Sequence, residues 1–98
     1  MAVTVIGDLH FRPEAVEGVL EFLKEILPDT RSYAGFVSID VVQDQEDPGH
    51  ILLVEQWDSS DHHKAYVAWR AETGVLDSLG DSLMAAPAFT YCTQRTDV

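Results

Sequence analysis

The sequence of 98 residues predicts an α+β fold in which a four-stranded antiparallel sheet carries helices on one face. Two observations predict this fold. Segments with strand and helix patterns follow one another in the order strand, helix, strand, strand, helix, strand. In addition, the turn-forming run Asp44 to Gly49 joins the two middle strands as a hairpin.

The N-terminal half contains the first strand and the first helix. Alternating apolar residues predict a strand over residues 2–9. Pro13 stands at a first helical position, and apolar residues then recur at three- and four-residue steps. This spacing predicts an amphipathic helix over residues 13–27, which Pro28 and Asp29 end.

The remaining elements follow from similar patterns. Strands are expected over residues 36–43 and 50–57, and the second of these is apolar on both faces, which predicts that both are covered. Possible N-cap residues at 58–61 start a helix to about Thr73, and a second helical piece spans 75–85. A last strand is expected over 89–95. This order is the split βαβ, or ferredoxin-like βαββαβ, arrangement, in a single domain over residues 1–98.

Charge and composition exclude several classes of partner. Six Lys and Arg against seventeen Asp and Glu give a net charge of −11, which repels nucleic acid and anionic membranes. The N-terminus lacks the pattern of an export signal, so the cytoplasm is the expected compartment. The single cysteine, Cys92, excludes an internal disulfide and is expected to be a small buried filler.

The predicted layers leave one sheet face bare. Two helices cover a single face of four strands, yet the opposite face also carries apolar strand residues. A second copy packed about a two-fold axis would cover it. We therefore expect a homodimer that associates through its sheet faces.

Residues 54–69 are rich in aromatic and histidine side chains. Helical spacing groups them into two neighbouring faces, one with His62, Tyr66, Trp69 and Thr73, the other with His63, Val67 and Arg70. The first face is interpreted either as core packed on the sheet or as the wall of a pocket for an aromatic substrate. Because adjacent helical side chains point about 100° apart, the two histidines cannot chelate one metal as a pair, and no metal is expected.

Other polar residues have structural interpretations as well. Glu55 shares a strand face with Trp57 and apolar residues, so an ion pair with Arg31 or Arg70 is expected. His10 ends the first strand and His50 begins the third. These strand ends are neighbours, so the two histidines either meet at a rim of the pocket or lie there by chance.

The stretch Thr30 to Asp61 resembles the antibiotic biosynthesis monooxygenase domain of the dimeric α/β barrel proteins. The matching residues are Thr30, Arg31, Gly35, Asp44, Pro48, Glu55, Trp57 and Ser59. The resemblance implies a dimer with facing sheets and a pocket between each sheet and its own helices. Some members oxidise polycyclic phenols or quinols with O₂ and no bound cofactor, and others bind and degrade haem.

Two positions depart from the family pattern. Tyr66 stands about where many members have a histidine, and the chain has no asparagine, which the haem-degrading branch uses near the end of the first strand. The leading hypothesis is therefore a cofactor-independent monooxygenase that oxidises a phenol or quinol with O₂. The alternatives are a non-catalytic dimeric protein that binds a small molecule and, less favoured, a haem protein.

Roles for individual residues follow from this hypothesis. Deprotonation makes a phenol a better electron donor to O₂, so the protein must supply an apolar slot, a base and a partner for the oxyanion. Trp57, Tyr66 and Trp69 are predicted to build the slot. His62 or His63 is the predicted base, and Arg70 or Tyr33 the oxyanion partner.

Overall fold

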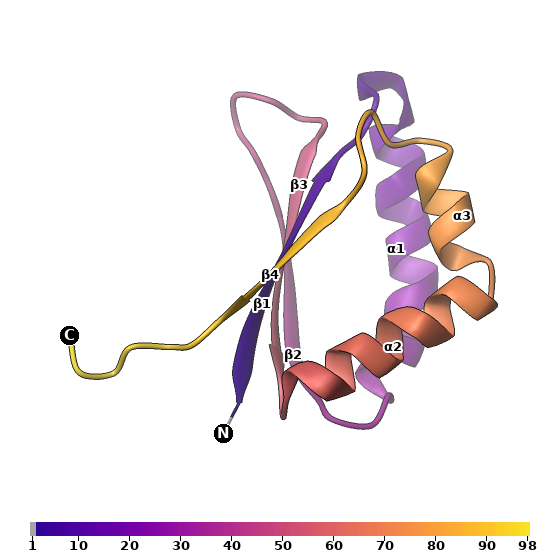
Figure 1. The fold of residues 1–98 in the computed structure, drawn as a ribbon. Coiled ribbons are helices and arrows are strands. Elements are labelled where there is room, and N and C mark those ends of the chain that lie inside the picture. The colour runs from indigo at the N-terminus through magenta and orange to yellow at the C-terminus, as the bar shows by residue number, and fades with distance from the viewer. Residues whose placement is uncertain (1) are drawn as a thin grey trace.

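Four antiparallel strands form one sheet in the order β2-β3-β1-β4 in the computed structural model, which describes residues 2–98. The elements are β1 (Val3–His10), a 3₁₀ turn η1 (Pro13–Ala15), α1 (Val16–Arg31), β2 (Phe36–Gln43), β3 (His50–Trp57), α2 (Ser60–Glu72), α3 (Val75–Gly80) and β4 (Ala88–Cys92). Figure 1 shows all three α-helices on the same side of the sheet. The α+β, ferredoxin-like fold expected from the sequence is confirmed.

The core lies between the inner face of the sheet and α1. Apolar residues at three- and four-residue steps give α1 one buried stripe, which packs on the strand residues Leu9 and Ile51. The buried cluster consists of Leu9, Phe11, Val16, Val19, Leu23, Leu27 and Ile51. This packing fixes α1 along the sheet, whereas α2 crosses near one end of the strands (Figure 1).

Helix α1 continues beyond its expected end, so the prediction that Pro28 terminates it was wrong. Pro28 has no N–H to offer the carbonyl group of Lys24, but both residues lie on the exposed side of the helix. Thr30 follows on the buried side and is only 1% exposed. Tertiary contacts of this last turn therefore outweigh the single missing backbone hydrogen bond.

The C-terminal elements are shorter than expected. Helix α3 ends at Gly80 rather than 85, and β4 ends at Cys92 rather than 95. Cys92 itself is half-buried, not fully buried. Residues 93–98 lead away from the sheet (Figure 1). No helix within residues 2–98 combines the length and apolar character needed to cross a membrane.

The outer face of the sheet is not covered by any other part of residues 2–98 (Figure 1). Ile6 and Val54 pair on neighbouring strands and are only half-buried, as is Leu52. Val42, on the edge strand beside Leu52, is 42% exposed. Apolar side chains of three strands thus face solvent in the single chain.

Candidate functional site

A cavity of about 230 Å³ lies between the inner face of the sheet and the three helices. Its wall is mostly apolar, with contributions from Leu23, Ile39, Leu53, Leu76, Leu83 and Phe89. Five titratable side chains interrupt that wall: Glu55, His63, Tyr66, Arg70 and the exposed Asp77 of α3. Three of them project from α2 at steps of three and four residues, and Glu55 faces them from β3.

Glu55 and His63 are the most deeply buried of these groups. The Glu55 residue is 2% exposed, and its Oε1 accepts a hydrogen bond of 3.0 Å from the indole N–H of Trp57. The second carboxylate oxygen, Oε2, lies 3.8 Å from His63 Nε2, which is too far for a hydrogen bond. His63 Nε2 is also the buried side-chain atom that lacks a hydrogen-bond partner among residues 2–98.

Burial shifts both groups away from their charged forms. It raises the pKa of Glu55, an effect that the hydrogen bond from Trp57 partly offsets. It lowers the pKa of His63 to about 4, so the imidazole is neutral near pH 7. The pair is therefore not a salt bridge at neutral pH, and the imidazole and carboxyl groups are free to exchange a proton with a bound molecule.

Tyr91 of β4 orients the His63 ring. Its hydroxyl group lies 2.9 Å from His63 Nδ1, and either atom can donate this hydrogen bond. Burial and the nearby charge of Glu55 raise the pKa of Tyr91, which keeps the phenol protonated. When Tyr91 accepts, Nδ1 carries the imidazole proton and Nε2 presents its lone pair beside Glu55.

Arg70 supplies a buried positive charge. The residue is 4% exposed, and its Nε donates to the Tyr66 hydroxyl at 2.9 Å. Its Nη2 donates to the Ile26 carbonyl at 2.6 Å and to Thr30 Oγ1 at 2.9 Å. The Thr30 and Tyr66 hydroxyl groups share a further hydrogen bond of 2.6 Å.

These partners of Arg70 are all neutral. Within residues 2–98, no carboxylate lies within 4.0 Å of its guanidinium. A buried cation with only neutral acceptors remains electrostatically uncompensated and favours an anion nearby. The expected ion pair of Glu55 with Arg31 or Arg70 is therefore wrong: Glu55 contacts Trp57 and His63, and Arg31 is exposed.

His62 does not line the cavity. Its backbone N–H donates to the Ser59 hydroxyl at 3.2 Å, which caps α2, and its Nδ1 lies 2.7 Å from the same oxygen. The ring covers Gly35, which has a φ of 86°, and a Cβ at that position would lie 2.3 Å from the imidazole. Of the two adjacent histidines, His63 alone points into the cavity.

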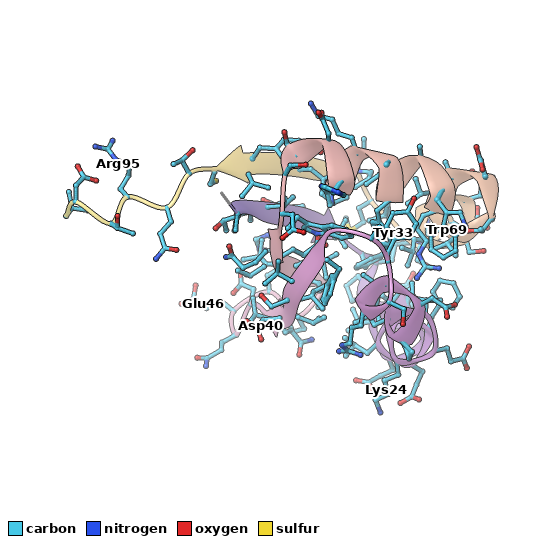
Figure 2. The ribbon with its side chains drawn as sticks, turned by 90° about the horizontal axis from the view of Figure 1, so that it is seen from below. Lys24, Tyr33, Asp40, Glu46, Trp69 and Arg95 are labelled. Atoms are coloured by element: carbon cyan, nitrogen blue, oxygen red, sulfur yellow. The ribbon has the colours of Figure 1, made fainter. Side chains whose placement is uncertain are left out.

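Two of the three predicted slot residues, Trp57 and Trp69, form an aromatic cluster with Tyr33 and Tyr66 next to the cavity and do not line it. Trp57 is fully buried and its ring lies 5.1 Å from that of Tyr66. Tyr33 stacks on Trp69 with ring centres 5.3 Å apart, and Figure 2 shows the two side by side. Only Tyr66 belongs both to this cluster and to the cavity wall.

His10 and His50 do meet, but away from the cavity. Their rings stack with centres 4.2 Å apart, beside Asp8. The alternating residues Leu9 and Ile51 point inward to the core, so the two histidines lie on the outer face. Of the two interpretations given for them, the one that places them at a rim of the cavity is therefore wrong.

Comparison with known proteins identifies the family. The family model described as antibiotic biosynthesis monooxygenase matches residues 2–71. The chain belongs to this family. A comparison with curated protein sequences found no match.

Solved structures of other proteins share the fold. One, described as an antibiotic biosynthesis monooxygenase, is 22% identical with a TM-score of 0.84 over 95% of this chain and 98% of its own. A conserved protein from Methanosarcina mazei Go1 is 17% identical with a TM-score of 0.85, covering 97% and 94% of the two chains. A protein from Deinococcus radiodurans named for the same family is 24% identical with a TM-score of 0.81, covering 98% and 95%.

At these identities the structures establish the fold alone. Membership of the antibiotic biosynthesis monooxygenase family supports a monooxygenase-type function in general terms. Which reaction the cavity of this family member performs is an inference from its own residues.

Proposed function

We propose that this protein is a cofactor-independent monooxygenase that oxidises a phenol or quinol with O₂ in the cavity between sheet and helices. One observation carries the proposal. A buried carboxyl group, Glu55, faces the unpartnered Nε2 of His63 in a wall that is mostly apolar. Titratable groups with shifted pKa values in an apolar cavity are characteristic of sites that transfer protons.

In this proposal Glu55 accepts the substrate proton. Its raised pKa brings the carboxylate closer to the working pH, which makes it a better base, whereas the lowered pKa of His63 makes the imidazole a weaker one. The 3.8 Å between Glu55 Oε2 and His63 Nε2 allows one substrate oxygen to lie within hydrogen-bonding distance of both. When the Tyr91 hydroxyl group donates to Nδ1, His63 Nε2 carries the imidazole proton and donates it to the substrate oxygen, which positions the hydroxyl group that Glu55 deprotonates.

Arg70 stabilises the anion that results. Its guanidinium has no carboxylate partner among the described residues, and Tyr66 holds it in the cavity wall. An anionic oxygen bound near this charge gains more from it in an apolar cavity than in water. The function that the sequence assigned to Arg70 is therefore retained in the proposal, whereas Tyr33 and His62 have none.

The reaction balances without a further reductant. The phenolate transfers an electron to O₂, and the two radicals combine to form a peroxide at a ring carbon that carries hydrogen, para to the oxygen in a phenol and ortho to it in a quinol. Loss of water from that peroxide gives the quinone, so that one phenol and one O₂ give one quinone and one water. One oxygen atom enters the ring, the other leaves as water, and the substrate supplies all four electrons.

Oxygen uptake with a panel of quinols, anthrones and naphthols tests the proposal. We expect uptake without added flavin or metal, and Glu55→Gln should lower kcat by about 10²-fold or more, because the amide cannot accept the proton. Glu21→Gln, an exposed carboxylate on α1, is the matched control and should leave uptake unchanged.

Two results would instead favour the alternatives. Thermal stabilisation by a panel compound without oxygen uptake would make the protein a binding module. A Soret band on mixing with haemin, lost in His63→Gln, would make it a haem protein.

A further inference from the structure

We propose that Asp8, His10 and His50 form a binding site for a divalent transition metal on the outer face of the sheet. His50 Nε2 lies 2.7 Å and His10 Nε2 3.2 Å from the same oxygen, Asp8 Oδ1. All three potential ligand atoms lie within 4.8 Å of one another. Imidazole nitrogen combined with a carboxylate oxygen is a donor set typical of zinc and related ions.

The sheet register builds this arrangement. His10 and His50 are directly paired on β1 and β3, and Asp8 precedes His10 by two residues and so shares its face. The two rings stack nearly parallel, at 6°, and both Nε2 atoms lie close to Asp8 Oδ1. The cluster lies at the end of the sheet next to the β2–β3 loop (Figure 1) and takes no part in the cavity wall.

Asp44 fixes the orientation of the His50 ring from the β2–β3 loop. Its Oδ2 lies 3.1 Å from His50 Nδ1, and its Oδ1 accepts the backbone N–H groups of Glu46 and Asp47 at 2.9 and 3.3 Å. A carboxylate that accepts a proton from one imidazole nitrogen leaves the other as a lone pair, as metal-binding histidines require. Asp44 is therefore a positioning residue rather than a ligand.

Local charge also favours a cation. Within residues 2–98, no lysine or arginine lies within 4.0 Å of the Asp8 or Asp44 carboxylate. The basic side chains that contact these carboxylates are His10 and His50. A metal ion between Asp8 and both Nε2 atoms would bring positive charge to these two carboxylates. In the single chain, about half of each of the Asp8 and His10 side chains is exposed, so an ion can reach them from solvent before a second copy covers this face.

Calorimetric titration of the EDTA-treated protein with Zn²⁺ tests the site, and visible absorption with Co²⁺ reports its ligands. We expect one ion per chain with a Kd below about 10 μM. His10→Gln and Asp8→Asn should each weaken binding at least ~100-fold. Asp44→Asn, which removes only the positioning contact, should weaken it ~10- to 100-fold.

His62→Gln is the matched control, because this histidine lies outside the cluster, and it should bind Zn²⁺ as the wild type does. Circular dichroism verifies that each variant is folded. Because the His10 side chain is about half exposed, we expect His10→Gln to fold as the wild type does. Binding that His10→Gln leaves unchanged, or no binding by the folded wild type at 100 μM Zn²⁺, would overturn the proposal.

Discussion

Tyr66 connects the two helices that hold Arg70 in the cavity wall. Its hydroxyl group accepts from Arg70 and shares a hydrogen bond with Thr30, so it joins α2 to the last turn of α1. At the position where the resemblance to the family led us to expect a histidine, Tyr66 thus accepts a hydrogen bond from the guanidinium.

Tyr66→Phe should therefore lower the free energy of unfolding by about 1–3 kcal/mol, because buried donors of Arg70 and Thr30 lose their acceptor. Tyr33→Phe is the matched control, since that hydroxyl makes a single bond of 3.4 Å at an exposed position, and it should cost much less. Urea denaturation measures both. Equal losses in the two variants would contradict this role of Tyr66.

His63 should make stability depend on pH. Its pKa is about 4 in the folded protein against 6.5 for the ordinary side chain, so the unfolded chain takes up a proton that the folded chain excludes. The neutral imidazole makes its full contribution to the free energy of unfolding above pH 6.5, and this contribution is lost as the pH falls toward 4. The loss amounts to at most about 3 kcal/mol.

The raised pKa of Glu55 acts in the opposite direction, since it favours proton uptake by the folded state. The comparison that isolates the imidazole is therefore wild type against His63→Gln. The unfolding free energy of the wild type, minus that of the variant, should fall between pH 7 and pH 4. A difference independent of pH would show that His63 is not buried in its neutral form.

At the scale of elements, α2 determines which side chains reach the cavity. Its first turn is fixed by the Ser59 hydroxyl, which accepts the backbone N–H of His62. Ser59→Ala should cost about 0.5–2 kcal/mol in chemical denaturation, the usual range for a lost N-cap. Ser60→Ala, in the next position, lacks this capping bond and serves as the control.

The sequence could predict the element order, because apolar period and turn residues are local signals. It could not predict which histidine faces inward, since His62 and His63 lie on adjacent faces of one helix. That choice depends on the ring of His62 filling the space above Gly35, a contact between segments distant in sequence. The stop expected at Pro28 failed for a related reason, because the buried contacts of Thr30 hold the last turn.

The charged residues of the site follow the same logic. The position of Glu55 on an apolar strand face correctly predicted that this carboxylate is buried. Its partner could not be predicted, because the sequence does not show whether His63 or Arg70 of α2 packs beside it, and only the tertiary structure separates the two.

At the scale of the whole molecule, the bare outer face of the sheet supports the proposed homodimer. Half-buried apolar side chains of β1 and β3 form its centre, and a second copy of the same face would remove them from water. Analytical ultracentrifugation of the wild type should therefore give a dimer of the 10.9 kDa chain.

Val54→Glu would place a charge at the centre of that face and should yield monomer. Val98→Glu makes the same substitution at a fully exposed terminal position and should remain dimeric. A monomeric wild type at micromolar concentration would contradict the expected association.

The cavity wall divides its tasks between different segments. Glu55 on β3 and three residues of α2 supply every group with a proposed chemical role. Helix α1 and the remaining strand residues supply only apolar surface, and α3 supplies apolar surface together with the exposed Asp77. Substitutions in the apolar wall can therefore change which substrate binds without changing the groups that react with it. Exchanging Leu23 or Leu76 for larger or smaller side chains would change the size of the molecule that the cavity accepts, while the proton acceptor and the guanidinium stay in place.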